Sequence, residues 1–155
     1  MAERPPQLAD AIAPGTSLLI DSSVVLAYLA GREATGARAE ELFDAFVATG
    51  RNPASMSMIT VAQILVRPFR SGPRAVATAE AFLQHFADVR LAPVSYEVAR
   101  QAASLRAAAG LPMPDALIVS TAIVTGADLI VTNDRSWRRR LEKVVPAVEI
   151  LELSA

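Results

Sequence analysis

The sequence predicts an α/β fold built on a parallel β-sheet. Short apolar segments of strand length alternate with longer segments of helical periodicity, an order typical of parallel sheets. Hydrophobic residues make up 52% of the chain and charged residues 20%. That balance suits a sheet covered by helices on both faces, or a dimer with an apolar interface. The 155 residues fit a single domain, expected over residues 16–155, after a flexible N-terminal lead-in of residues 1–15.

Five segments are expected to form strands. In the first, three apolar residues run straight into Asp21, where the strand ends. The second and fifth alternate between the two faces, as half-buried strands do, and the fifth is expected at an edge of the sheet. The remaining four segments are residues 55–58, 89–91, 127–132 and 148–153.

Helices are expected between the strands. Apolar residues at helical spacing mark them, and Gly31, Gly50 and Gly110 suit their ends. Thr60 is expected to cap the helix that starts at residue 61, and Pro68 to kink or end it. The last helix is apolar nearly all round and should be buried. The expected helices are residues 24–30, 33–50, 61–69, 74–86, about 96–109 and 116–125.

Three aspartates stand at junctions between these elements. Asp21 ends the first strand, Asp115 opens the apolar helix and Asp134 follows the fourth strand. Because the carboxyl ends of parallel strands meet at one edge of a sheet, these acids can face one crevice. Clustered carboxylates raise one another's pKa, and a divalent cation relieves the repulsion. Carboxylate and water ligands suit Mg²⁺ or Mn²⁺, which can activate water and stabilise a phosphodiester under in-line attack.

Each aspartate also has a purely structural interpretation. Asp21 can cap the helix that follows it, and Asp115 can interact with a helix dipole as a first-turn acid. Asp134 can form an Asx turn after Asn133. Position alone leaves the metal site and the structural roles both open.

Composition excludes several kinds of protein. The chain has no cysteine, so a metal would need oxygen ligands or the single histidine, His85, which is expected at the surface near a helix end. A net charge of -1 argues against a non-specific nucleic-acid binder. The apolar runs are shorter than the roughly 20 residues that a membrane span needs, and residues 1–15 lack a signal-peptide pattern. A cytoplasmic protein is expected.

Three segments resemble the PIN domain family. Leu18-Leu19-Ile20-Asp21-Ser22-Ser23 is similar to the opening signature of that family. Residues 111–118 (LPMPDALI) resemble the segment that carries the third acid of the family. Residues 126–134 (GADLIVTND), followed by Trp137, resemble the segment that carries the fourth acid. Order and spacing match over roughly residues 17–153. The closest subgroup is the VapC-like toxins of bacterial and archaeal toxin–antitoxin pairs.

The resemblance implies a compact α/β/α sandwich with a central parallel sheet of about five strands, and a Mg²⁺- or Mn²⁺-dependent endoribonuclease. Asp21 and Asp115 would be the principal metal ligands, and Asp134 would complete the catalytic pocket. Ser22 and Thr132 would orient the acids through their hydroxyls. Such proteins are often homodimers, neutralised by a cognate antitoxin whose peptide enters the active-site groove. RNA, an antitoxin and a second copy are therefore the expected partners, and a membrane is not.

Gln63 departs from the family pattern. It matches the position of the second acid, usually a glutamate, and a neutral amide is a weaker ligand and no general base. Natural divergence or deliberate replacement would both put a glutamine there. Residues 60–63 also fit a capping box, the preferred local interpretation. Glu97 is the other acid that could stand in, although a first-turn dipole role is favoured for it.

Gln63 leaves a second function open: a catalytically degenerate PIN-like module that binds an antitoxin or RNA without efficient cleavage. An unrelated α/β signalling domain with an acidic metal pocket is the third alternative. Near the fourth acid, Trp137 is expected in the core rather than as a base-stacking surface. Residues 138–140, three arginines, either contact RNA phosphates or form a solvated face.

Overall fold

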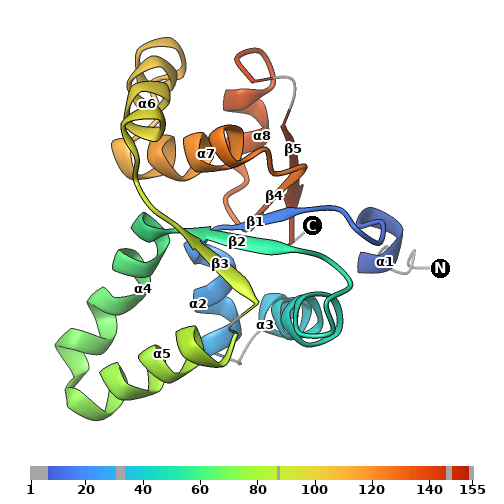
Figure 1. Ribbon diagram of the computed structural model, residues 1–155, viewed down its shortest axis with the longest axis vertical. Coiled ribbons are helices and arrows are strands. Elements are labelled where there is room, and N and C mark those ends of the chain that lie inside the picture. The colour runs from blue at the N-terminus through green and yellow to red at the C-terminus, as the bar shows by residue number, and fades with distance from the viewer. Residues whose placement is uncertain (1–6, 31–33, 87, 146–147, 154–155) are drawn as a thin grey trace.

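The chain folds around a five-stranded parallel sheet in the order β3-β2-β1-β4-β5 (Figure 1). The computed structural model describes residues 7–30, 34–86, 88–145 and 148–153. All four neighbouring strand pairs are parallel, so the expected fold class is confirmed. The strands are β1 (Leu18–Ile20), β2 (Ala54–Ser57), β3 (Val89–Ala92), β4 (Leu129–Thr132) and β5 (Glu149–Glu152).

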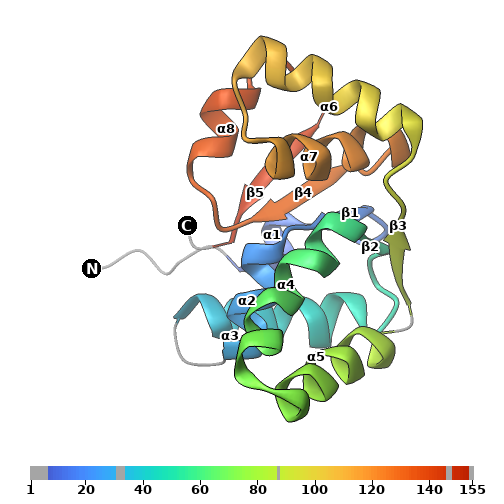
Figure 2. The same ribbon diagram turned by 90° about the vertical axis from the view of Figure 1, so that its left-hand side faces the viewer.

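Helices cover both faces of the sheet, which gives the expected sandwich. Figure 2 shows α6, α7 and α8 on one side and α2, α3, α4 and α5 on the other. No helix in the described ranges is long and apolar enough to cross a membrane. The helices are α1 (Leu8–Ala11), α2 (Ser22–Ala30), α3 (Ala34–Glu41), the π-helix η1 (Leu42–Val47), α4 (Met58–Ser71), α5 (Pro73–His85), α6 (Tyr96–Ala109), α7 (Met113–Thr125) and α8 (Ser136–Leu141).

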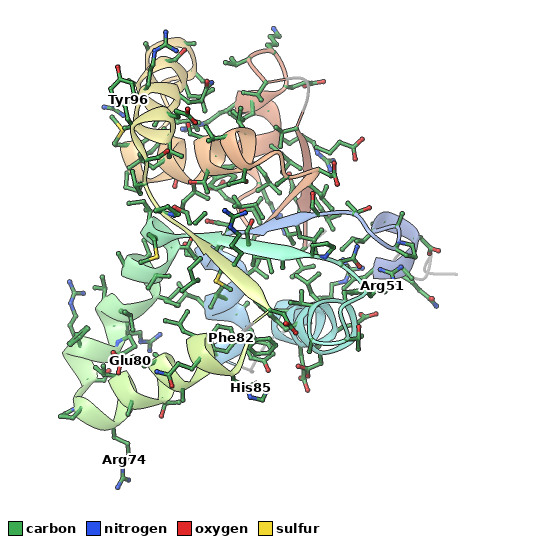
Figure 3. All side chains as sticks on the ribbon, in the orientation of Figure 1. Arg51, Arg74, Glu80, Phe82, His85 and Tyr96 are labelled. Carbon is green, nitrogen blue, oxygen red and sulfur yellow. The ribbon has the colours of Figure 1, made fainter. Side chains whose placement is uncertain are left out.

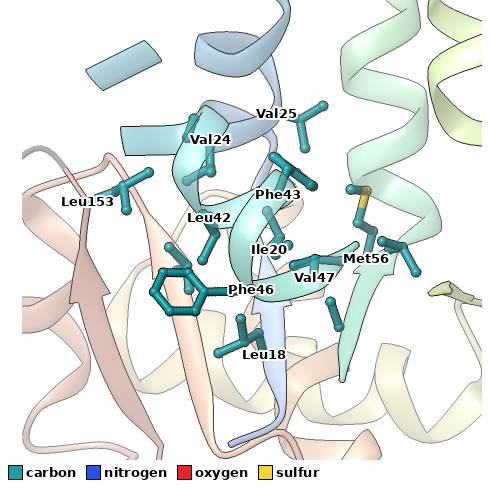
Figure 4. Packing of buried hydrophobic residues seen from close by; sticks show 14 of the residues in the cluster. Leu18, Ile20, Val24, Val25, Leu42, Phe43, Phe46, Val47, Met56 and Leu153 are labelled. Atoms are coloured by element: carbon teal, nitrogen blue, oxygen red, sulfur yellow. The ribbon is translucent and has the colours of Figure 1, made fainter. Parts of the chain in front are cut away.

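The central strand β1 contributes to both halves of the core. Leu18 and Ile20 join the cluster on the α2 side, shown in Figure 4, whereas Leu19 joins the cluster on the α7 side. All three are at most 1% exposed. Burial on both faces explains why this strand is continuously apolar up to Asp21. The core therefore fixes the position of Asp21, the residue that directly follows this strand.

Residues 7–15 do not form the flexible lead-in that was expected. They contain α1, and Leu8 and Ile12 are 2% and 0% exposed, one helical turn apart and directed into the same core. Arg51 and Asn52 donate hydrogen bonds to the carbonyls of Ile12 and Ala13, both at 2.8 Å. A short apolar pair was enough to dock this segment. Residues 1–6 lie outside the described part of the chain.

Two further element boundaries differ from those expected from the sequence. The helix expected to kink or end near Pro68 continues to Ser71 and ends at Gly72, whose φ is 127°. The turn expected after the fourth strand leads into α8. The boundaries expected at Gly31 and Glu33 lie outside the described residues. His85 is exposed at the end of α5 and away from the sheet, as expected (Figure 3).

An aromatic cluster holds α2, η1 and α5 together. Tyr28 and Phe43 have ring centroids 4.9 Å apart, Phe43 lies 5.2 Å from Phe86, and Phe82, labelled in Figure 3, lies 5.5 Å from Phe43. Phe43 is fully buried. Such rings dominate the energetics of a core. The cluster therefore makes a large contribution to stability, at a distance from the acids.

We predict that Phe43→Ala lowers the free energy of unfolding by roughly 3–5 kcal/mol, because it leaves a large cavity. Urea unfolding followed by circular dichroism measures this. Phe69→Ala is the matched control, since that ring is 68% exposed, and its effect should stay within about 0.5 kcal/mol. Equal losses in the two variants would contradict the packing described above.

Candidate active site

The pairing of β1 with β4 brings two polar residues together at the carboxyl edge of the sheet. Ile20 lies opposite Val131, so Asp21 and Thr132 are the next residues on each strand. The Asp21 N–H donates to the Val131 carbonyl at 3.0 Å. Asp21 is only 4% exposed, and the fully buried Thr132 hydroxyl donates to its Oδ2 at 2.9 Å. A buried carboxylate is thus held at the centre of the sheet edge.

Hydroxyl groups orient the Asp21 carboxylate. Ser23 Oγ donates to Oδ2 at 2.7 Å and accepts the Asn133 N–H at 2.9 Å. Ser22 Oγ lies 3.4 Å from Oδ1, a much longer contact. The short hydrogen bond to the acid therefore comes from Ser23 rather than from the predicted Ser22. The sequence offers both serines, but only the rotation of α2 against β4 selects between them.

Asp21 also contributes its main chain to α2, and no side-chain cap of that helix by Asp21 is seen among the described residues. Its main-chain carbonyl accepts the N–H groups of Val24 at 3.1 Å and Val25 at 3.4 Å, in the first turn of α2. The carbonyl serves the helix, whereas the side chain is engaged by the hydroxyls of Ser23 and Thr132. The two roles use different atoms and are compatible.

Asp134 forms the Asx turn that was considered for it. Its Oδ1 accepts the Ser136 N–H at 2.9 Å and the Ser136 hydroxyl at 2.7 Å. These bonds lie at the start of α8, a helix that no pattern in the sequence predicted. The Asp134 N–H donates to Thr132 Oγ1 at 3.0 Å, so Thr132 links Asp134 to Asp21. Thr132 thus connects two of the three acids, which agrees with the orienting role expected of it.

Asp115 lies in the first turn of α7, within the electrostatic reach of the other two acids. Burial raises the pKa of its carboxyl group, and the negative charges of Asp21 and Asp134 raise this pKa further. The Trp137 indole and the Arg140 charge oppose these effects. A helix dipole alone would lower the pKa of a first-turn acid. The three predicted aspartates therefore interact, although they come from three separate segments of the chain.

Gln63 does not take part in the expected capping box. Ser57 is the N-cap of α4, and its hydroxyl accepts the Ile59 N–H at 3.1 Å. Thr60 therefore lies within the first turn, so its predicted capping role is wrong. The cause is Ser57, an equally good capping residue three positions earlier. Gln63 Oε1 is buried and has no hydrogen-bond partner among the described residues.

The donors around this edge of the sheet suit a hard cation, but they do not form a closed cage. Asp21, Asp115 and Asp134 offer oxygen atoms, the ligands that Mg²⁺ and Mn²⁺ prefer. In the ranges that the structure describes, no three carboxylate or imidazole groups lie close enough to hold one ion together. An ion would therefore have fewer direct protein ligands and several waters. Glu97 is exposed in the first turn of α6, which suits its expected dipole role.

A sequence profile decides the family. The profile of the PIN domain matches residues 18–143, most of the chain. The chain belongs to the PIN domain family. No curated protein sequence matches it. The family assignment agrees with the resemblance carried by the segments around Asp21, Asp115 and Asp134.

Solved structures of low sequence identity share the fold of this PIN domain. VapBC2 from Rickettsia felis, bound to a promoter DNA fragment, superposes with a TM-score of 0.67 at 15% identity, over 88% of this chain and 98% of that one. The VapC20 toxin of Mycobacterium tuberculosis, which cleaves the sarcin–ricin loop, superposes with a TM-score of 0.63 at 19% identity. The match covers 79% of this chain and 93% of that one. A toxin–antitoxin complex from Klebsiella pneumoniae superposes with a TM-score of 0.63 at 18% identity, over 84% of this chain and 94% of that one.

We predict that Asp115→Asn stabilises the metal-free protein at neutral pH. Because the pKa of Asp115 is raised on folding, its ionisation costs stability once the pH exceeds the ordinary carboxyl range, and that cost grows until the raised pKa is passed. The gain should be below about 1 kcal/mol, since water partly screens a half-buried charge. Thermal unfolding in a chelator, from pH 3 to pH 8, measures it. A gain that is equally large at pH 3 would contradict the electrostatic explanation.

Proposed function

We propose that this PIN domain is a Mg²⁺- or Mn²⁺-dependent endoribonuclease and the toxin of a toxin–antitoxin pair. The observation that carries the proposal is the interaction of three aspartates at the carboxyl edge of the sheet, where burial and then the charges of Asp21 and Asp134 raise the pKa of the Asp115 carboxyl. A fold gains nothing from such repulsion by itself. Binding a divalent cation would turn that repulsion into attraction.

The residues present fit such an ion. Asp21 and Asp115 are proposed as its direct ligands, which matches the one or two carboxylates that commonly bind Mg²⁺ together with water. The buried Gln63 Oε1 has no donor among the described residues, so it is an acceptor suited to a metal-bound water. When bound, the ion would activate water and stabilise charge on an RNA phosphodiester.

The remaining residues are proposed to position these ligands. Thr132 and Ser23 donate to the same oxygen of Asp21, Oδ2, at 2.9 and 2.7 Å, which directs the carboxylate and limits its rotation. Asp134 completes the pocket, because its main chain is bonded to Thr132 and its charge reaches Asp115. Removing such supporting hydrogen bonds from a metal site typically costs 10–100-fold in affinity or activity.

The surface of α2 and α4 supports an antitoxin partner. These two helices contact each other, and both expose large apolar side chains. Leu26 and Leu29 of α2 are 40% and 38% exposed, and Val66 and Phe69 of α4 are 48% and 68% exposed. An apolar antitoxin segment is proposed to cover them. The toxin–antitoxin complex from Klebsiella pneumoniae has a chain of the same fold. A homodimer and a cytoplasmic location are proposed from the resemblance to the VapC-like toxins.

One observation favours a second function. Gln63 stands where the family usually has an acid, and its amide adds no negative charge to the site. A site with three acids attracts a cation less strongly and has one fewer candidate general base. The alternative is therefore a PIN module that binds antitoxin or RNA and cleaves RNA poorly.

We predict that Asp21→Asn lowers Mn²⁺ affinity at least about 100-fold and abolishes metal-dependent RNA cleavage, because it removes a charged ligand. Calorimetric titration with Mn²⁺ and a cleavage assay on total RNA measure these effects. Asp128→Asn is the matched control, since Asp128 bonds Ser17 at 2.8 Å before β4 begins, at the opposite end of that strand. Unchanged Mn²⁺ affinity in both Asp21→Asn and Asp115→Asn would refute the ligand assignment.

We predict that Gln63→Glu raises metal-dependent cleavage by about tenfold or more, because it restores the carboxylate that the family pattern has at this position. Initial rates with and without Mn²⁺ test this prediction. Gln84→Glu, on the exposed surface of α5, adds the same charge elsewhere and should change nothing. Cleavage by the Gln63→Glu variant together with none by the natural sequence would favour the binding module; no gain would mean that another residue supplies the acid.

A further inference from the structure

Trp137 carries a buried polar group whose role packing does not explain. It is the single tryptophan of the chain and is 1% exposed. Its indole N–H is buried and makes no hydrogen bond within the described part of the molecule. Buried N–H groups are almost always paired, since they lose their bonds to water. A phenylalanine would fill this core position without that cost.

The ring of Trp137 packs beside the start of α7, the helix that carries Asp115. Trp137 is the second residue of α8, which begins at the Asx turn of Asp134. Its ring belongs to the same apolar cluster as Leu111 and Ala116, which flank the start of α7. The indole N–H is close enough to interact with the Asp115 carboxylate, but outside hydrogen-bond geometry. The donor therefore stands beside an acceptor that it does not yet engage.

Asp21 and Asp115 differ in their supporting contacts. Two hydroxyls, from Ser23 and Thr132, donate to Asp21. Metal-binding carboxylates usually have such donors, which fix the oxygen that faces the ion. For Asp115, the indole N–H of Trp137 approaches the carboxylate. Trp137 would thus do for Asp115 what the two hydroxyls do for Asp21.

We propose that Trp137 is a positioning residue of the metal site: its indole N–H donates to one oxygen of Asp115 and leaves the other oxygen for the cation. The proposal rests on the function proposed above. It assigns the buried N–H of Trp137 a partner, and it gives α8 a role in the site. A small rotation of the Asp115 side chain on cation binding completes the hydrogen bond.

The single tryptophan makes a direct test possible. One indole N–H signal is expected in a ¹⁵N-correlated NMR spectrum of the full chain, and Mg²⁺, which is diamagnetic, can be titrated into the sample. The indole proton should move downfield as Mg²⁺ saturates the site, because a hydrogen bond to a carboxylate forms. A signal that stays in place while other resonances report Mg²⁺ binding would overturn the inference.

We predict that Trp137→Phe weakens Mg²⁺ and Mn²⁺ binding about tenfold, because the ring is kept and only the N–H donor is lost. Calorimetry measures the affinity, and cleavage at saturating metal should recover most of the wild-type rate. Phe43→Leu is the control for lost core packing, and its metal affinity should equal that of the wild type. Equal affinities for Trp137→Phe and wild type would overturn the inference.

The outcomes separate the two proposals. Wild-type protein that binds Mg²⁺, with an unmoved indole signal and an unaffected Trp137→Phe variant, leaves the proposed function intact and refutes the role of Trp137. Wild-type protein that binds no Mg²⁺ or Mn²⁺ refutes both. The NMR titration uses the unmodified chain, so it decides the question even if Trp137→Phe fails to fold.

Discussion

The hydrogen bond from Thr132 to Asp21 is the interaction on which the candidate site depends. It joins β1 and β4, the central strand and its neighbour, at the point where both leave the sheet. Leu19 and Ile130, which lie opposite each other before this point, are fully buried, and a shift in this register would separate Asp21 from Thr132. The acid therefore stands on a rigid part of the molecule, as a preorganised site requires.

Repulsion among the acids is the second constraint. Asp115 enters from α7, and its carboxyl pKa is raised partly by the charges of Asp21 and Asp134. A fourth carboxylate at Gln63 would increase this repulsion in the metal-free protein. In the site that we propose, the glutamine would favour folding without metal and weaken the attraction for a cation. This trade between stability and charge is common at functional sites, and it places Gln63 between an active nuclease and a binding module.

The fold and the three aspartates were predictable because they follow from patterns along the chain. Apolar runs that stop at Asp21, and before Asp134, mark the ends of buried parallel strands, and parallel strands end at one edge. The choice of Ser23 over Ser22 was not predictable, because it depends on how α2 rotates against β4. The cap at Ser57 displaced the one expected at Thr60, since both residue types are good caps. The role proposed for Trp137 needed a buried, unpaired N–H, which no sequence pattern reveals.

We propose that one divalent cation binds between Asp21 and Asp115 at the carboxyl edge of the sheet. The most direct measurement is anomalous diffraction from crystals of the unmodified protein soaked in Mn²⁺. We expect an anomalous peak within coordination distance of a carboxylate oxygen of each residue, with water completing the shell. Crystals that take up Mn²⁺ elsewhere, for example at the exposed Asp128, and show no peak at this edge would contradict it.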